Sequence, residues 1–202
     1  MVELFIQGGG FMWPILFIFI IGFVFVGERL FHLIKGLSAN EAFAEGIVET
    51  FENDGVEEAQ NECESAGGPV ANLCYNALEK ANDGAAAAEK TLDQTGSIEM
   101  ASLEKNMTWI SLCIATAPML CFLGTVWGMI EAFREIEAAN DISPAVVAGG
   151  ISVALLTTAF GLVVAVILQV LQNAVMYIID NQIVTMQKST TMLLGAIEKK
   201  KK

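Results

Sequence analysis

Long runs without a charged residue constrain this chain of 202 residues more than any other feature. Residues 11–27 and 142–179 contain no Asp, Glu, Lys or Arg, and 54% of the whole chain is apolar, against about 45–50% in soluble domains. A helix needs about 20 apolar residues to cross a bilayer. The sequence therefore predicts an all-α, polytopic membrane protein with three transmembrane helices, at about residues 11–34, 107–133 and 145–171.

These spans divide the chain into four expected segments. They are an N-terminal segment with the first span (1–35), an acidic cytoplasmic helical segment (36–106), the second and third spans joined by a short periplasmic loop at 135–144 (107–179), and a cytoplasmic tail (180–202). The stretch 142–179 would be about 57 Å long as a helix, nearly twice the hydrocarbon thickness of about 30 Å. We therefore expect the third helix to continue beyond the lipid. The second is expected to begin near Ala85 and to run unbroken to Pro118, so that both extend into a cytoplasmic helical bundle.

The distribution of basic residues predicts the orientation. Arg29 and Lys35 follow the first span, the loop at 135–144 is acidic, and the chain ends in four lysines. Basic loops favour the cytoplasmic side. This places the N-terminus in the periplasm and the C-terminal tail in the cytoplasm.

Residues 41–104 hold fifteen Asp or Glu and only two Lys, which argues against nucleic acid as a partner. The segment is interpreted as a solvated surface, with a docking face for a basic partner as the alternative. Three turn signals divide it into short helices, at residues 53–55, 67–69 and 82–84, and Ser38 with Glu41 has the spacing of a capping box. The terminal lysines suit anionic membrane lipid.

Small and polar residues recur at helical spacing on two spans. On the third span they are Gly150, Ala154, Thr158, Gly161, Ala165, Gln169 and Gln172; on the second they are Ser111, Ala115, Pro118, Thr125 and Gly128. Pro118 removes a backbone hydrogen bond and is expected to kink or loosen its helix. Such stripes fit close helix packing, with each hydroxyl bonded to its own preceding turn. They also fit a polar path through the membrane, and both interpretations stay open.

No catalytic or metal-binding constellation is visible, so we do not expect an enzyme. The chain has one histidine, His32, which excludes the usual triads, and its four cysteines lack metal-ligand spacing. No ionisable residue lies at mid-depth in a span, although ion paths normally need one. A partner helix that bears a carboxylate would complete such a path.

At these residues the chain resembles the MotA/TolQ/ExbB proton-channel family, and in size and span number the ExbB branch. The matching stretches are Pro14 to Leu30, Leu123 to Ile130 with Gly124-Thr125, and Ala154 to Leu162 with Thr157-Thr158. The resemblance implies a homopentamer in a bacterial inner membrane around an ExbD- or TolR-like single-span partner that supplies a membrane Asp. It implies H⁺ or Na⁺ as the translocated ion without a cofactor, and a TonB-like protein that receives the work. The residues it places along the ion path or against the partner helix are Thr125, Thr158, Thr157, Ser152, Ala154, Gly161, Pro118 and Gly128.

The chain departs from the family pattern at two points. Val153 stands where ExbB and TolQ proteins commonly carry a glutamate, and residues 166–168 lack the proline that is common there. The coupling ion is therefore left open between proton and sodium. The alternatives are a TolQ- or MotA-type stator subunit, or a non-conducting scaffold for a partner helix; a membrane enzyme or permease is disfavoured by the absence of intramembrane ionisable groups.

Overall fold

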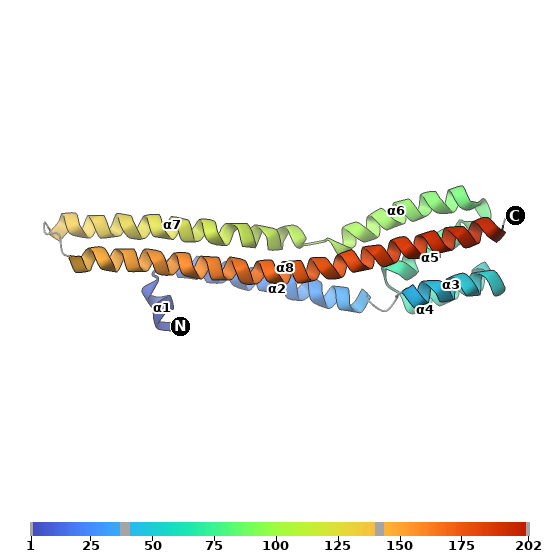
Figure 1. Ribbon diagram of the computed structural model, residues 1–202, viewed down its shortest axis with the longest axis horizontal. Helices are drawn as coiled ribbons and strands as arrows, with labels where there is room; N and C mark the ends of the chain where they lie inside the picture. Colours follow the sequence, from blue (N-terminus) through green and yellow to red (C-terminus); the bar gives the residue numbers. More distant parts are fainter. Residues whose placement is uncertain (1, 37–40, 140–143, 201–202) are drawn as a thin grey trace. The chain divides into compact units, whose positions relative to one another are not determined.

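The computed structural model describes residues 2–36, 41–139 and 144–200, and within these ranges it is helical with no strand. Figure 1 labels the elements. They are α1 (Val2–Gln7), α2 (Met12–Gly36), α3 (Glu41–Asn53), α4 (Val56–Ala66), α5 (Pro69–Glu79), the 3₁₀ turn η1 (Ala81–Asp83), α6 (Ala85–Leu103), α7 (Met107–Ala139) and α8 (Pro144–Lys200). The all-α prediction is confirmed.

The chain forms two compact units. The membrane unit comprises residues 1–28 and 106–174, and the acidic unit comprises residues 29–105 and 175–202. Three helical stretches are long and apolar enough to span a bilayer, which confirms the predicted number; they fall within 12–34, 85–138 and 147–200. Helices α2 and α8 contribute residues to both units.

In the membrane unit, α7 and the first part of α8 run side by side in opposite directions, with the first part of α2 against them (Figure 1). Their shared core is built from small and medium apolar side chains. It consists of Ile15, Cys113, Ala117, Cys121, Val164, Ala165 and Leu168. Gly22 of α2 lies against Leu168, where an added Cβ would be 2.7 Å from Leu168 Cδ1. These residues hold α2 closely against the α7–α8 pair.

The prediction of one unbroken helix from Ala85 to Pro118 is wrong, because the helix is interrupted between Leu103 and Met107. A turn at 104–106 separates α6 from α7, and Asn106 adopts the left-handed φ of 65°. Asn106 Nδ2 donates to Glu28 Oε2 at 2.9 Å, which holds the start of α7 to α2. Asparagine tolerates this conformation better than most residues. Helix α7, in contrast, continues through Pro118.

The acidic unit gathers α3 to α6 beside the last part of α8 (Figure 1). The predicted turns are confirmed, because α3 ends at Asn53, α5 begins at Pro69 and η1 ends at Asp83. Glycines with φ of 102° at Gly55 and 111° at Gly84 occupy two of them, a region open to glycine at low cost. The core between the helices includes Ile47, Phe51, Leu73, Leu78, Leu92, Met186 and Leu193.

Long side chains join the helix ends of the acidic unit. Arg29 is 2% exposed, and its Nη1 donates to the carbonyl of Ser102 at 3.2 Å. Lys200 Nζ donates to the carbonyl of Phe51 at 2.7 Å and lies 4.4 Å from the centre of its ring. These contacts fix the end of α8 against α3 and the end of α2 against α6.

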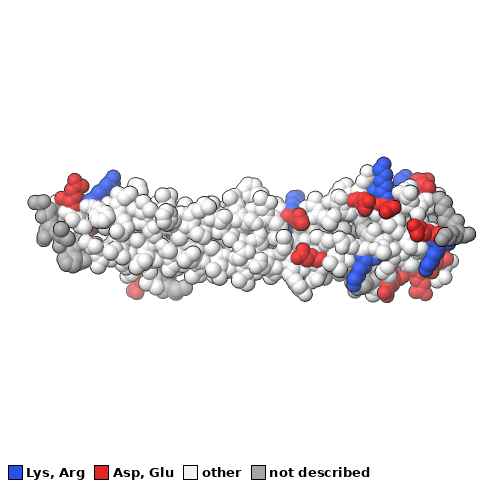
Figure 2. All heavy atoms as spheres, turned by 45° about the horizontal axis from the view of Figure 1, so that its top comes forward, with Lys and Arg blue, Asp and Glu red and all other residues white. Residues whose placement is uncertain are grey.

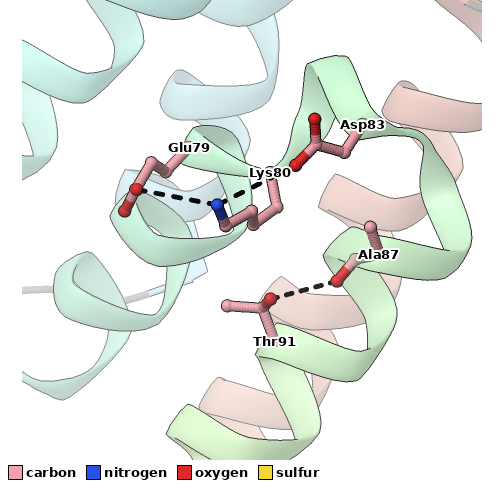
Figure 3. A network of polar contacts seen from close by, with 5 residues as sticks. All are labelled: Glu79, Lys80, Asp83, Ala87 and Thr91. Carbon is pink, nitrogen blue, oxygen red and sulfur yellow. Dashed lines mark hydrogen bonds and ion pairs between the residues drawn. The ribbon is translucent and has the colours of Figure 1, made fainter.

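Charged side chains gather over the acidic unit (Figure 2). The visible face of the membrane unit carries few charged side chains apart from those at the end of α7. Figure 3 shows one exposed cluster, in which Lys80 Nζ lies 3.9 Å from Glu79 Oε1 and 3.8 Å from Asp83 Oδ2. Beside it, the Thr91 hydroxyl donates to the carbonyl of Ala87. Exposed ion pairs of this kind contribute little to stability.

The helices extend further than the predicted segments. Helix α7 continues to Ala139, so helix occupies residues 135–139 of the predicted loop. Helix α8 continues to Lys200 and includes the described part of the predicted tail. The predicted capping box at Ser38 lies outside the described residues.

Candidate functional site

Glycines bring α7 and α8 of the membrane unit into close contact. A Cβ added at Gly161 would lie 2.5 Å from Cys121 Cβ and 3.1 Å from the carbonyl oxygen of Ala117. A Cβ added at Gly150 would collide with Ala132 Cβ. Small residues allow helix backbones to approach in lipid, where the hydrophobic effect does not drive helices together. We call this contact the seam.

Thr157 lies within the seam. It is 1% exposed, and its Oγ1 donates to the carbonyl of Ala154 at 2.8 Å. Opposite it stands Gly124 of α7, where an added Cβ would be 3.5 Å from Thr157 Cβ. Gly128 faces Ala154 in the same way, because a Cβ added at Gly128 would be 3.8 Å from Ala154 Cβ. Thr157, Ala154, Gly161 and Gly128 therefore have their contacts inside the chain.

Thr125 and Thr158 lie beside the seam and are half-buried. Because α7 and α8 are antiparallel and each threonine adjoins the facing pair Gly124 and Thr157, the two sit within about 3 Å of one level along the helix axes. The sequence grouped Thr158 with Gly150 and Gly161 on one face. In the structure Thr157 completes that face, and Thr158 lies about 100° round the helix from it.

Both threonines also point away from α1 and α2. Thr158 is two residues from Phe160, whose ring contacts Phe5 of α1 at 6.4 Å between centroids. Thr125 is two residues from Trp127, whose ring contacts Phe11 at 6.4 Å. Side chains two residues apart on a helix point about 160° apart. Thr125 and Thr158 thus share one side of the α7–α8 pair, which we call the threonine flank.

Each hydroxyl of the threonine flank donates to its own preceding turn. Thr125 Oγ1 donates to the carbonyl of Phe122 at 2.7 Å, and Thr158 Oγ1 to that of Ala154 at 3.2 Å. A hydroxyl oxygen that has used its proton in this way can still accept hydrogen bonds. The threonine flank therefore offers acceptor oxygens to water, to a protonated carboxyl or to a cation.

The other predicted site residues lie apart from these two hydroxyls. Pro118 is half-buried on α7, seven residues before Thr125 and hence on the same side. Ser152 is exposed on α8 and lines an open hollow of about 600 Å³ with Ile151 and Leu155. Val153 faces Gly9, where an added Cβ would be 3.6 Å from Val153 Cγ1. The position where the family commonly has a glutamate thus lies on the α1–α2 side.

The sequence did not predict which α7 residues face the seam, nor the hydrogen bond between α7 and α8 at Ser111 and Gln172. Ala117, Cys121 and Ala132 face the α8 glycines, and their only signal was spacing by three or four residues among small side chains. Gln172 Nε2 donates to Ser111 Oγ at 2.6 Å, which links two residues that the sequence had assigned to separate stripes. Among the described residues, no group of three His, Cys, Asp or Glu could hold a metal ion.

Two cysteines of the acidic unit, Cys63 and Cys74, are buried. Burial raises the pKa of the Cys63 thiol to about 12, with a smaller contribution from Cys74, and burial also raises the pKa of Cys74 to about 12. Neighbouring Glu64 raises the pKa of the Tyr75 hydroxyl. Thiols in this state do not act as nucleophiles near neutral pH.

Comparison with known proteins gives a consistent picture. A model of the MotA/TolQ/ExbB proton channel family matches residues 65–188. The chain is 32% identical over 183 residues to the putative biopolymer transport protein ExbB homolog of Methanothermobacter thermautotrophicus, covering 90% of this chain and 65% of that protein.

Other relatives match over shorter stretches. The chain is 40% identical over 78 residues to the biopolymer transport protein ExbB of Xanthomonas campestris pv. campestris, covering 39% of this chain and 31% of that one. It is 35% identical over 68 residues to the Tol-Pal system protein TolQ of Haemophilus influenzae, covering 34% and 30%. In each case the match spans less than two thirds of the relative's length.

Proposed function

The chain belongs to the MotA/TolQ/ExbB proton channel family, and from this premise we propose that it is the ExbB-like subunit of an ion-driven motor. It is a multi-pass protein of the inner membrane and a channel subunit rather than an enzyme. The proposed assembly is a homopentamer around an ExbD- or TolR-like single-span helix, which passes work to a TonB-like protein. The single observation that carries the proposal is the placement of Thr125 and Thr158 at one level on the threonine flank.

The proposed mechanism follows from what the threonine flank contains and lacks. Residues 107–130 and 145–171 carry no Asp, Glu, His, Lys or Arg, so these stretches have no carboxylate or basic group that could take up a proton at mid-depth. A carboxylate there is costly unless it is hydrated, paired or protonated. In the proposal, the partner supplies the membrane Asp, and the hydroxyl oxygens of Thr125 and Thr158 hold the water or ion that reaches it.

The proposed cycle uses the difference between the two protonation states of that Asp. The neutral acid can donate a hydrogen bond to a threonine oxygen and move along apolar helix surface at low cost. The ionised form is held where water enters the threonine flank. Rotation of one component within the other would then couple ion passage to work.

The proposed orientation places the N-terminus in the periplasm and the C-terminus in the cytoplasm. Its support is the basic character of the end of α2, with Arg29 and Lys35, and of the end of α8. The acidic unit would then lie in the cytoplasm. Protease protection of a C-terminal epitope in right-side-out vesicles tests this orientation.

The function is tested by Thr158→Val in the complex with its partner, reconstituted into proteoliposomes. Valine has nearly the same shape as threonine but lacks the hydroxyl oxygen. The substitution therefore removes the hydrogen-bond acceptor and leaves the packing almost unchanged. We expect the subunit number to be kept and ion flux to fall about tenfold or more, the effect of losing roughly 1.4 kcal/mol of stabilisation along the path. Thr158→Ser should restore flux, and Thr191→Val in the acidic unit is the control, because its hydroxyl also donates only to its preceding turn.

A non-conducting scaffold is the second candidate, and the seam favours it. Gly150, Thr157 and Gly161 are fully explained by packing within one chain. A scaffold predicts that Thr125→Val and Thr158→Val together leave both assembly and cell growth unchanged. Absence of ion flux in the original complex, together with unchanged assembly and growth in the double variant, would favour this alternative over the motor.

The coupling ion is a further part of the proposal. Val153 replaces the glutamate of many relatives, but its side chain lies on the α1–α2 side, so its absence leaves the threonine flank unchanged. Hydroxyl oxygens suit both hydrated protons and Na⁺. Ion flux measured in sodium-free and in sodium-containing buffer at equal membrane potential distinguishes the two ions. The same measurement distinguishes an ExbB- or TolQ-type proton motor from a sodium-driven MotA-type stator.

A further inference from the structure

A small cavity lies on the α1–α2 side of the membrane unit, opposite the threonine flank. Its volume is about 200 Å³, and it is bounded by α1, α2 and α8. All of its lining side chains are apolar, among them Met12 and Ile15 of α2 and Val163 and Ile167 of α8. Because no polar group points into it, it cannot recognise a headgroup, an ion or a polar ligand.

The rings of Phe5 and Phe160 form an aromatic wall of the cavity, and Trp13 supports Phe5 from outside the lining. Phe5 of α1 meets Trp13 edge-on at 5.4 Å between centroids, with an interplanar angle of 86°. It also meets Phe160 of α8 edge-on, at 85°. Edge-to-face contacts are the preferred arrangement of aromatic pairs. They hold α1, which is only six residues long, across the cavity.

The backbone before α2 sets the position of this wall. A Cβ added at Gly8 would lie 2.7 Å from Met12 Sδ, so the turn that joins α1 to α2 presses on a cavity residue that is itself 1% exposed. The same turn at Gly9 lies against Val153 of α8. Helix α1 is therefore held on the spans from two sides.

We infer that this cavity is a seat for one acyl chain of a membrane phospholipid. The lining residues on α2 and α8 lie in the charge-free stretches 11–27 and 142–179, so the surrounding solvent at that depth is lipid hydrocarbon. A dry cavity of about 150 Å³ with a comparable lining takes an apolar guest rather than water. A flexible acyl chain fits such a space, and Phe5 would retain it beside α2 and α8.

The test compares two equal substitutions on α8. Val163 lines the cavity and is 55% exposed, whereas Val166 lies three residues further, is 61% exposed and does not line it. Val163→Trp fills the cavity, and Val166→Trp adds the same indole to the outer surface. Each full-length complex is passed through vesicles of dioleoylphosphatidylglycerol and re-extracted in dodecyl maltoside, and retained phospholipid is counted by native mass spectrometry.

We expect the original chain and Val166→Trp to retain one more phospholipid per chain than Val163→Trp. Equal retention in all three proteins, or none in the original chain, overturns the inference. A changed subunit number in Val163→Trp with unchanged phospholipid would also overturn it, because it would show that a second copy of the chain fills the cavity. Phe5→Ala supplies an independent measurement, since loss of the wall should speed exchange of the retained lipid while leaving the spans intact.

Discussion

The seam of the membrane unit and the core of the acidic unit solve the same packing problem with different residues. The seam brings Gly150 and Gly161 against Ala132 and Cys121, so backbones almost touch. The acidic unit fills its interior with larger side chains such as Leu73 and Leu78, both buried. In water, burial of large apolar side chains drives helices together. In lipid that gain is absent, and close contact between small residues replaces it.

The difference also decides what each unit does with polar groups. The acidic unit covers its surface with carboxylates, which water solvates (Figure 2). The charge-free stretches of the membrane unit hold hydroxyls, amides and thiols but no charged side chain, and the threonines bond to their own preceding turns. Because back-bonding leaves acceptor oxygens, a hydroxyl can be tolerated in lipid and still serve a path. The seam and the threonine flank use neighbouring threonines for these two purposes.

The largest effect is expected when a large side chain enters the seam. Gly161→Leu would place its Cβ against Cys121 and the Ala117 backbone, and backbone cannot yield as a side-chain end can. The cost should exceed the roughly 1–3 kcal/mol of ordinary overpacking, and the protein should fail to accumulate in the membrane. Gly149→Leu is the control, because nothing lies within 4 Å of a Cβ at Gly149. Equal accumulation of both variants would show that the seam does not depend on close approach.

The acidic unit should respond in the opposite way, to loss of volume. Leu78 is 0% exposed, so Leu78→Ala removes buried surface and leaves a cavity, at a cost of about 2–5 kcal/mol. Amide hydrogen exchange in α5 should accelerate correspondingly. Ile98→Ala, at a position that is 70% exposed, should change exchange little. If the two variants behaved alike, the acidic unit would lack the core described above.

Thiol reactivity measures how dry that core is. The pKa of Cys63 and of Cys74 is raised from 9.0 to about 12. At pH 8 the thiolate fraction of each should therefore be about a thousandfold lower than that of a free thiol. Alkylation by iodoacetamide, located by mass spectrometry, should be slow until the chain is unfolded in dodecyl sulfate. Rapid labelling of the native protein would show that water reaches these residues.

The same raised pKa values give a direction for stability against pH. The unfolded chain loses thiol protons near pH 9, whereas the folded chain keeps them until about pH 12. Since the unfolded state then binds fewer protons, stability should fall as pH rises above about 9. Thermal unfolding between pH 8 and pH 11 should show this fall, and it should be smaller in a chain with Cys74→Ala.

The smallest effect is expected at the exposed ion pairs of Lys80. Lys80→Ala removes contacts of 3.9 Å and 3.8 Å to Glu79 and Asp83, which are worth under about 1 kcal/mol. The melting temperature should change little, and added salt should reduce the difference further. A large loss of stability would mean that charge pairing, rather than buried volume, holds this unit.

Much of the fold follows from the sequence because its signals are local. Charge-free runs give the spans, and glycines such as Gly55 and Gly84 give the turns. The break before α7 was missed because Glu104 and Lys105 are good helix formers and only the left-handed Asn106 marks it. The family, identified from Thr125 and the Thr157-Thr158 pair, is confirmed by the match over residues 65–188.

The division of the threonines could not be read from sequence. Thr157 and Thr158 are adjacent and chemically identical, and their roles separate only once Gly124 is seen to face Thr157. Periodicity fixes the angle between two side chains but not which of them meets α7. For the same reason, spacing alone did not show that Val153 faces Gly9 rather than the threonine flank.

The central claim is that the threonine flank is wet while the seam is dry, and neighbouring cysteines test it most directly. Thr158→Cys and Thr157→Cys, each in the assembled complex, are exposed to a water-soluble, charged methanethiosulfonate, and modification of the new cysteine is measured by mass spectrometry. We predict that Cys at 158 is modified and Cys at 157 is not. Equal protection of both, with reaction only toward a lipid-soluble reagent, would contradict the account.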